Sequence, residues 1–360
     1  MDHFYALIMA GGGGTRLWPM SRIETPKQLL PLIEEHSMFA VAVERLAPLF
    51  PPENIYVVTG RAYVDALKAD APDIPARNFI VEPYGKESGP AAALSVAVIQ
   101  KRDPLATIAM LTADHHIADK EAFRDVLRAA YEVAQQDRIV TLGISPSVPS
   151  TGFGYIRRGA KTGVTGGFKV YQSRGFTEKP DTQTAVRFIR SGDYSWNSGM
   201  FIWKATKALA EIQRQKPEWY TLLQELEPNI DTPAYDSTLD HIWETISKVS
   251  LDVAIMEHAE DMAVIPVDIG WSDVGTWDAL FEVLDLDESG NGFKGASPDR
   301  IIVDTRNTLV YSDKLTVTIG IEDVIVIETK DVLMICHRQR TQDVKAIVQR
   351  LRETNHDSYL

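Results

Sequence analysis

The arrangement of short apolar runs in the first 145 residues constrains the fold more than any other feature of this chain. Five such runs, β-branched and bounded by turn residues, lie at residues 4–10, 55–59, 78–81, 107–112 and 139–144. Amphipathic stretches that suit helices lie between them, at residues 39–49, 91–100 and 122–135. Near-continuous apolar strands separated by helices are what a parallel sheet covered on both faces requires. The pattern predicts an α/β fold whose ligands bind beyond the carboxyl ends of the strands.

The pattern of predicted elements changes near residue 298, from mixed strands and helices to closely spaced β runs. Between residues 150 and 285 we expect strands at 167–177, 196–204 and 262–269, with helices at 184–190, 207–214 and 250–258. No linker rich in Pro, Gly or Ser interrupts this section. Later β runs lie at 300–304, 308–311, 315–319, 324–327 and 332–337, separated by polar turns, before a final helix at 341–353. We therefore predict a mixed, mostly parallel domain over residues 1–290 and a compact β-rich domain with a terminal helix over residues 298–360.

Charge and cysteine content exclude several classes of protein. The 37 basic and 50 acidic residues give a net charge of −13, which argues against a nucleic acid or a membrane surface as partner. The single cysteine, Cys336, excludes an intrachain disulfide and a cysteine-rich zinc site. The apolar run at the N-terminus ends at Ala10, which is too short for a signal segment or a membrane span. We expect a reducing compartment, namely the cytoplasm.

A run of glycines, residues 11–14, directly follows the first predicted strand. Backbone N–H groups of such a loop can converge on anionic oxygens because no Cβ obstructs their approach. A dinucleotide fingerprint would need a glycine where Arg16 and Leu17 stand, and a P-loop would need Gly-Lys followed by Ser or Thr. Both motifs are therefore excluded. Arg16 within the loop and Lys27 beyond it add the positive charge that phosphate oxygens need; the alternative is a flexible turn with solvated surface cations.

The loop is also part of a longer string that resembles a known family. Gly-Gly-Gly-Gly-Thr-Arg-Leu-Trp-Pro at residues 11–19, Ser-Arg at residues 21–22 and Pro-Lys-Gln at residues 26–28 resemble the signature of sugar-nucleotide pyrophosphorylases, in the form of the mannose-1-phosphate guanylyltransferase branch. Six ordered blocks extend the resemblance over almost the whole chain, at residues 82–91, 111–115, 151–156, 176–180, 196–201 and 270–275. The chain departs from the family at residues 86–89, where Lys-Glu-Ser-Gly replaces the usual Arg-Asn-Thr-Ala.

The resemblance implies a nucleotidyltransferase fold and an enzyme that uses Mg²⁺ to transfer GMP from GTP to α-D-mannose 1-phosphate. A phosphate oxygen of the sugar phosphate attacks the α-phosphorus, and pyrophosphate leaves in line. The attacking group is already an anion, so the protein needs to supply positioning and fixed positive charge rather than a general base. Two alternatives stay open: a nucleotidyltransferase for another hexose or heptose 1-phosphate, and a non-catalytic sugar-nucleotide-binding homologue. An NAD-dependent oxidoreductase would need the fingerprint that is excluded above.

Five side chains receive catalytic roles from the resemblance. Arg16 would meet the β- and γ-phosphates, and Lys27 would stabilise the charge that builds on pyrophosphate. Asp114 and Asp273 would hold Mg²⁺, which takes one or two carboxylates together with phosphate oxygens. Lys179 would hold the sugar phosphate. The alternative for the two aspartates is a role as turn or helix-capping residues, and for the cations a place on the solvated surface.

The remaining site residues are also implied by the resemblance. Glu178 is expected to accept hydrogen bonds from sugar hydroxyls, and Asn197 offers both a donor and an acceptor. The nucleotide would be bound by Gly11, Gly12, Gly14, Thr15, Arg16, Glu82, Pro83, Gly85, Ser88 and Asp114. The sugar phosphate would be bound by Gly154, Glu178, Lys179, Asn197 and Asp273.

The family further implies that the β-rich tail is a short left-handed β-helix, which suits a contact within a homodimer. Longer members of the family carry an additional isomerase domain. Here we expect guanylyltransferase activity alone.

Overall fold

The computed structural model describes residues 1–12, 14–296 and 299–360, and the chain forms two compact units from interleaved segments. The first unit contains residues 1–11, 42–113 and 117–271, and the second contains residues 12–41, 114–116 and 272–360. Gly13 of the glycine run and residue 298, the predicted start of the β-rich domain, lie outside the described residues. The domain boundaries expected from the sequence, at residues 290 and 298, stay a prediction.

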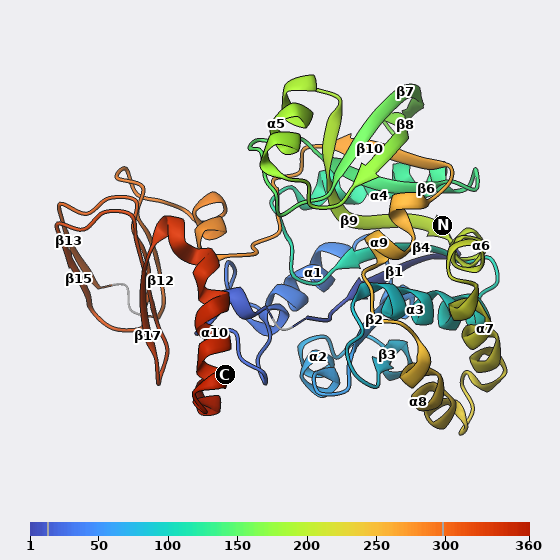
Figure 1. Cartoon of the computed structure of the whole chain (residues 1–360), viewed down its shortest axis with the longest axis horizontal. Coiled ribbons are helices and arrows are strands. Elements are labelled where there is room, and N and C mark those ends of the chain that lie inside the picture. Colours follow the sequence, from blue (N-terminus) through green and yellow to red (C-terminus); the bar gives the residue numbers. More distant parts are fainter. Residues whose placement is uncertain (13, 297–298) are drawn as a thin grey trace. The chain divides into compact units, whose positions relative to one another are not determined.

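The described part of the first unit is built on a nine-stranded mixed sheet with the order β3-β2-β1-β4-β9-β6-β10-β8-β7 (Figure 1). Its strands are β1 (Phe4–Met9), β2 (Ile55–Gly60), β3 (Phe79–Glu82), β4 (Thr107–Thr112), β6 (Ile139–Ile144), β7 (Tyr155–Thr165), β8 (Phe168–Thr177), β9 (Tyr194–Lys204) and β10 (Met262–Val267). The helices outside the second unit are α2 (Val64–Asp70), α3 (Ser88–Arg102), α4 (Lys120–Ala134), α5 (Thr182–Ser191), α6 (Ala205–Gln215), α7 (Pro217–Leu226), α8 (Tyr235–Thr245) and α9 (Leu251–Ala254), while α1 (Met38–Leu46) runs from one unit into the other.

The parallel half of this sheet is the part that the apolar runs predict. β1 pairs in parallel with both β2 and β4, so that Ile8 lies between Val57 and Leu111. All six residues of β6 are buried, and in α3 every residue from Gly89 to Ile99 is buried, as expected for elements enclosed on all sides. The expected fold class, a mixed and mostly parallel sheet flanked by helices, is confirmed.

The register places the strand ends from which three predicted ligand-binding segments continue at one edge of the sheet. Met9 at the end of β1 pairs with Thr112 at the end of β4, and Gly60 at the end of β2 pairs with Glu82 at the end of β3. Chain that continues from these strands leaves from their carboxyl ends, where open α/β sheets bind ligands.

Several elements differ from the sequence-based expectation. The expected helix at 250–258 is two short pieces, α9 and a 3₁₀ turn at Met256–His258, because Ile255 between them has φ −132° and ψ −51°. For β7 the sequence indicates only a loop around residues 151–156. Most residues of this strand are exposed, so the sequence shows no alternation of apolar residues that would predict a strand. Helices α2, α7 and α8 are likewise absent from the sequence-based prediction.

The second unit contains the C-terminal strands. Its described strands form one sheet, β12-β14-β16-β17, and a separate pair, β13-β15. Their bounds are β12 (Gly292–Lys294), β13 (Arg300–Val303), β14 (Leu309–Tyr311), β15 (Thr316–Ile319), β16 (Val324–Glu328) and β17 (Leu333–His337), followed by α10 (Val344–Glu353). Parallel register partners such as Gly292 and Leu309, or Arg300 and Thr316, are 16 or 17 residues apart, so successive coils of chain stack on one another. The expected β unit with a terminal helix is confirmed, and its left-handedness stays a prediction.

Residues from the glycine-loop region contribute to the core of the second unit. Leu17 and Trp18 pack with Trp277, Leu309 and other buried residues of this unit. Trp277 Nε1 donates to the main-chain oxygen of Trp18 at 2.9 Å, and Trp18 Nε1 donates to that of Tyr359 at 2.7 Å. The segment that follows the loop is thereby fixed by packing rather than by its own secondary structure. Among the helices of the described ranges, none is long and apolar enough to cross a membrane.

Candidate active site

Lys27 connects the two predicted metal ligands in the second unit. Its side chain is only 7% exposed, and Nζ donates to Asp114 Oδ2 at 2.9 Å and to the main-chain oxygen of Asp273 at 2.5 Å. A buried ammonium needs such partners because an unpaired charge in the interior is costly. The structure therefore brings Lys27, Asp114 and Asp273 together, although Asp273 contacts the lysine with its backbone and not with its carboxylate.

The two carboxylates of this cluster differ in their surroundings. Burial raises the pKa of Asp114, but the charges of Lys27 and His115 outweigh burial and hold the pKa below its usual range. The carboxylate is therefore ionised at neutral pH while its side chain is still 32% exposed. Asp273 Oδ1 accepts a hydrogen bond from the Gly275 N–H at 3.2 Å.

A magnesium ion fits the donor chemistry of this cluster. No group of three His, Cys, Asp or Glu residues within the described ranges is arranged to hold a metal ion. Mg²⁺ does not require such a cage, because it commonly takes one or two carboxylates and completes its shell with water and substrate phosphate oxygens. Asp114 and Asp273 supply two carboxylates, one kept ionised by its neighbours.

The glycine loop packs against Lys27. Gly14 has φ +55°, and a Cβ at this position would lie 2.5 Å from Cβ of Lys27. Glycine is required here both for the left-handed backbone and for the close approach. Arg16 is exposed and forms no ion pair or hydrogen bond within the described part of the chain, so its guanidinium is available to a ligand. Thr15, next to it, is half-buried, and Gly12 is exposed.

The predicted nucleotide segment in the first unit begins with a buried acid, Glu82. The residue is 5% exposed, its Oε2 has no hydrogen-bond partner among the described residues, and its Oε1 would lie 3.9 Å from a Cβ on Gly11. Burial raises the pKa of Glu82 to about 7, an effect only partly offset by a hydrogen bond from the Lys86 backbone. A half-titrated, incompletely bonded carboxyl group thus lies beside the first glycine of the loop.

The other residues of this segment are only partly available to a ligand. Pro83 is half-buried and Gly85 is exposed, with open space where its Cβ would be. Ser88 Oγ accepts a hydrogen bond from the Leu251 N–H at 2.9 Å, so its oxygen is engaged within the protein. Lys86 is buried and donates to main-chain oxygens of residues 244 and 246.

The predicted sugar-side residues of the first unit lie together. The Asn197 N–H donates to the main-chain oxygen of Gly154 at 2.8 Å. A Cβ on Gly154 would lie 2.5 Å from Glu178 Oε2, so only glycine leaves that carboxylate its place. Lys179 forms an ion pair with Glu178 and is 61% exposed, whereas Glu178 is only 16% exposed.

A further residue of this cluster, Asp252, was missed by the sequence analysis. Asn197 Nδ2 donates to Asp252 Oδ1 at 2.8 Å. Burial and the nearby Glu178 charge raise the pKa of Asp252 to about 6, against the lowering effect of the Asn197 hydrogen bond. The only local signal was Ser250, whose side chain caps the short helix α9 at the Val253 N–H. That pattern marks a helix start and says nothing about a contact with residue 197.

Comparison with known proteins agrees with this fold and identifies the family. The family model for nucleotidyl transferases matches residues 5–290, and the model for the mannose-phosphate isomerase/GMP-like β-helix domain matches residues 299–351. The chain therefore belongs to the nucleotidyl transferase family and is an enzyme of that class.

Similar proteins identify the branch of this family to which the chain belongs. The chain is 35% identical over 353 residues to the mannose-1-phosphate guanylyltransferase of Escherichia coli K12, covering 97% of this chain and 73% of that protein. It is 35% identical over 358 residues to the mannose-1-phosphate guanylyltransferase ManC of Salmonella typhimurium, with the same two coverages. A crystal structure described as mannose-1-phosphate geranyltransferase from Thermus thermophilus matches with a TM-score of 0.87 at 33% identity, over 97% of this chain and 99% of that one. Within the nucleotidyl transferases, the chain thus falls in the mannose-1-phosphate guanylyltransferase branch, as its motifs indicate.

Proposed function

We propose that this enzyme transfers GMP from GTP to α-D-mannose 1-phosphate, giving GDP-mannose and pyrophosphate. The observation that carries the proposal is the similarity, along 97% of the chain, to proteins named for this reaction. A phosphate oxygen of mannose 1-phosphate forms a bond to the α-phosphorus of GTP. The bond between that phosphorus and the oxygen bridging to the β-phosphate breaks, and the electron pair leaves with pyrophosphate.

The charged residues of the second unit suit the phosphate chemistry. Arg16, which has no internal partner among the described residues, offers its guanidinium to the β- and γ-phosphates. Lys27 supplies a fixed cation beside Asp114 and stabilises the charge that develops on the leaving group. Asp114 and Asp273 would hold Mg²⁺, which when bound supplies a Lewis acid for the phosphate oxygens.

Glu82 supports guanine as the base. Guanine presents two adjacent donors, N1–H and the exocyclic amine, and an ionised carboxylate accepts two parallel hydrogen bonds. Adenine presents an acceptor at N1, which a carboxylate would repel. The Oε2 of Glu82, which has no partner among the described residues and lies on the carboxyl group beside Gly11, is the kind of atom that such a base would satisfy.

The side chains around Gly154 support a sugar phosphate as the second substrate. Lys179 is exposed enough to reach an anion, while Glu178 and Asn197 offer groups for sugar hydroxyls. Because a few hydroxyl contacts decide the sugar's identity, another hexose or heptose 1-phosphate is the runner-up.

A substrate grid tests the proposal. Pyrophosphate release would be measured with GTP, ATP, UTP, CTP and dTTP, each against mannose, glucose, galactose and fucose 1-phosphates, in the presence of Mg²⁺. We expect the highest kcat/KM with GTP and mannose 1-phosphate. A maximum with another pair would move the assignment to the runner-up, and no turnover with any pair would favour a non-catalytic homologue.

The metal assignment has its own test. We expect Asp273→Asn to raise the Mg²⁺ concentration needed for half-maximal activity at least tenfold, because one of two carboxylates is lost. Asp268→Asn, at an exposed aspartate upstream of the same turn, is the matched control. The same effect in both variants, or no effect in either, would contradict the assignment.

We also propose that the protein is a cytoplasmic homodimer that associates through its β-rich region. Ile301 and Val317 are register partners in the β13-β15 pair, as are Val303 and Ile319, and all four are between 44% and 67% exposed. Such a row of apolar side chains favours a second copy as its cover. Light scattering should show twice the chain mass, and Ile319→Lys should yield the monomer; a wild-type monomer would contradict this proposal.

A further inference from the structure

The segment in which the chain departs from its family, residues 86–89, is bonded to the chain that leads into α9. Lys86 Nζ donates to the main-chain oxygens of Glu244 at 3.1 Å and Ile246 at 2.7 Å. The Gly89 N–H donates to the Val249 oxygen at 3.1 Å. Ser88 Oγ accepts from the N–H of residue 251, the first of α9. These bonds engage the side chains or backbone of three of the four departing residues.

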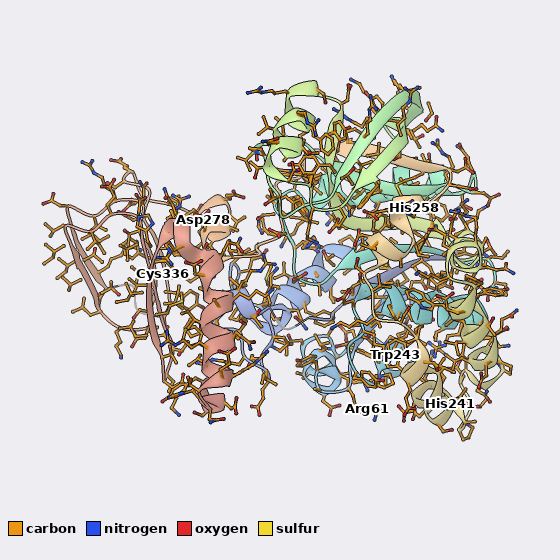
Figure 2. The ribbon with its side chains drawn as sticks, in the orientation of Figure 1. Arg61, His241, Trp243, His258, Asp278 and Cys336 are labelled. Carbon is orange, nitrogen blue, oxygen red and sulfur yellow. The ribbon has the colours of Figure 1, made fainter. Side chains whose placement is uncertain are left out.

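Tight packing around this segment makes the connection specific. A Cβ on Gly89 would lie 2.6 Å from the Val249 oxygen and 2.8 Å from the Trp219 ring, so an alanine would clash here. Trp243, labelled in Figure 2, donates from Nε1 to the main-chain oxygen of Tyr84 at 2.7 Å, and Tyr84 donates back to the Trp243 oxygen at 3.4 Å. Several hydrogen bonds thus join residues 84–89 to residues 243–251.

The hydrogen bonds between these two segments hold the position of Asp252. The residue lies in the first turn of α9, a helix of four residues with little stability of its own. Its carboxylate accepts from Asn197 Nδ2, while Asn197 Oδ1 accepts from the Gly199 N–H at 3.1 Å. These two partners therefore identify which end of the Asn197 amide is the nitrogen and which is the oxygen. One N–H and one oxygen lone pair of the amide stay available to a ligand.

The charges around Asp252 explain why it must be held. Glu178 repels its carboxylate, while Lys179 attracts it. Glu257, in the 3₁₀ turn after α9, accepts from the Glu178 N–H at 3.3 Å and adds negative charge to the cluster. Without the bonds to residues 86–89, repulsion between carboxylates would favour movement of α9 away from Asn197.

We infer that Asp252 is a positioning residue for the sugar: it fixes the orientation of the Asn197 amide, and Lys86 holds Asp252 in place through the backbone of residues 244–251. The inference rests on the proposed function, since it requires Asn197 to meet a sugar hydroxyl. It assigns residue 86, within a segment expected to serve the nucleotide, to the sugar.

The test compares the binding of GDP and GDP-mannose by calorimetry. The ratio of the two dissociation constants, Kd(GDP)/Kd(GDP-mannose), isolates the contribution of the sugar and cancels any effect on the base, including titration of Glu82. At pH 8 we expect Asp252→Ala to lower this ratio about tenfold, the loss of one charge-assisted hydrogen bond. Asp252→Asn, which keeps an acceptor for Asn197, should restore most of it.

Lys86→Met should lower the same ratio several-fold because it removes the bonds to the backbone. Lys68→Met is the matched control, since Lys68 lies over the ring of Phe79 at 5.7 Å much as Lys86 lies over that of Tyr84 at 5.4 Å, and it has no place in this connection. In the wild type the ratio should fall toward that of Asp252→Asn as the pH drops through about 6, where Asp252 takes up a proton and becomes a neutral, weaker acceptor. The terminal phosphate of GDP, which GDP-mannose lacks, also titrates at about pH 6, so the pH dependence of Asp252→Asn measures that contribution, and the wild type should show an additional fall.

The outcomes separate the two proposals. If GDP does not bind the wild type, the proposed function fails and the inference falls with it. If both ligands bind and Asp252→Ala leaves the ratio unchanged, or weakens both ligands equally, the proposed function stands and the positioning role of Asp252 is refuted. A ratio that is lowered as much by Lys68→Met as by Lys86→Met would refute the role of Lys86.

Discussion

Replacing the buried Glu82 by glutamine should make the stability of the protein less dependent on pH. Glu82 is 5% exposed, and its pKa is raised from 4.5 to about 7 by burial. Because the folded protein binds this proton more tightly than the unfolded chain, the stability of the folded state falls as the pH rises from about 4.5 to about 7. Above pH 7 the carboxylate is ionised in both states and its penalty is constant. The glutamine of the variant has no charge to bury.

The size of the effect follows from the two pKa values. A pKa difference of one corresponds to about 1.4 kcal/mol, so the change from 4.5 to about 7 is worth about 3 kcal/mol in total. Part of that is already lost at pH 5, which leaves about 2–3 kcal/mol between pH 5 and pH 8. Glu82→Gln should therefore gain about 2–3 kcal/mol of unfolding free energy relative to the wild type over this interval.

Urea-induced unfolding at pH 5, 6, 7 and 8, followed by circular dichroism, measures this difference. Glu218→Gln, at an exposed position on α7, is the control and should show no such trend. A difference between Glu82→Gln and the wild type that is the same at all four pH values would refute the argument that burial of Glu82 opposes its ionisation. The same reasoning predicts that GTP binds the wild type more tightly as the pH rises through 7. Glu82→Gln should show a smaller dependence, because only the terminal phosphate of GTP then titrates in this range.

Three further substitutions test the rest of the site. Lys27→Met should lower kcat/KM about 10²–10³-fold by removing a fixed cation beside Asp114, and a loss of less than tenfold in steady-state kinetics would argue against its role. Gly154→Ala should raise KM for the sugar phosphate about tenfold while KM for GTP is unchanged, because its Cβ displaces Glu178; equal changes in both constants would contradict a sugar-specific role. Gly14→Ala should cost at least about 1–2 kcal/mol of stability in urea unfolding, because its backbone is left-handed and its Cβ would meet that of Lys27; an unchanged unfolding midpoint would show that the loop has room to move.

Much of the fold could be predicted because its signals are local. The strands of the parallel half are short apolar runs in which nearly every residue is buried, so composition alone marks them. Their ends then indicate where ligand-binding segments lie, and Asp114 closely follows one such strand. The convergence of Asp114 and Asp273 was expected only from the resemblance, since nothing in their spacing brings them together. Their shared contact with Lys27 was not expected.

The parts that could not be predicted depend on contacts between distant segments. Asp252 contacts Asn197 because α9 and β9 meet in the folded chain, and no periodicity records that meeting. Lys86 is buried with its ammonium on main-chain oxygens, although a lysine is ordinarily assigned to the surface. The raised pKa of Glu82 likewise results from its burial in the folded chain and cannot be read from the residue's neighbours in the sequence.

The central proposal is that this enzyme transfers GMP from GTP to mannose 1-phosphate, and the fate of a labelled phosphate tests it directly. The enzyme would be incubated with Mg²⁺, mannose 1-phosphate and GTP labelled with ³²P at either the α- or the γ-position, and the products separated. We expect the α-label in GDP-mannose and the γ-label in pyrophosphate, in equal amounts. Label from the α-position that stays in GTP, or a γ-label found in free orthophosphate, would contradict the transfer of GMP.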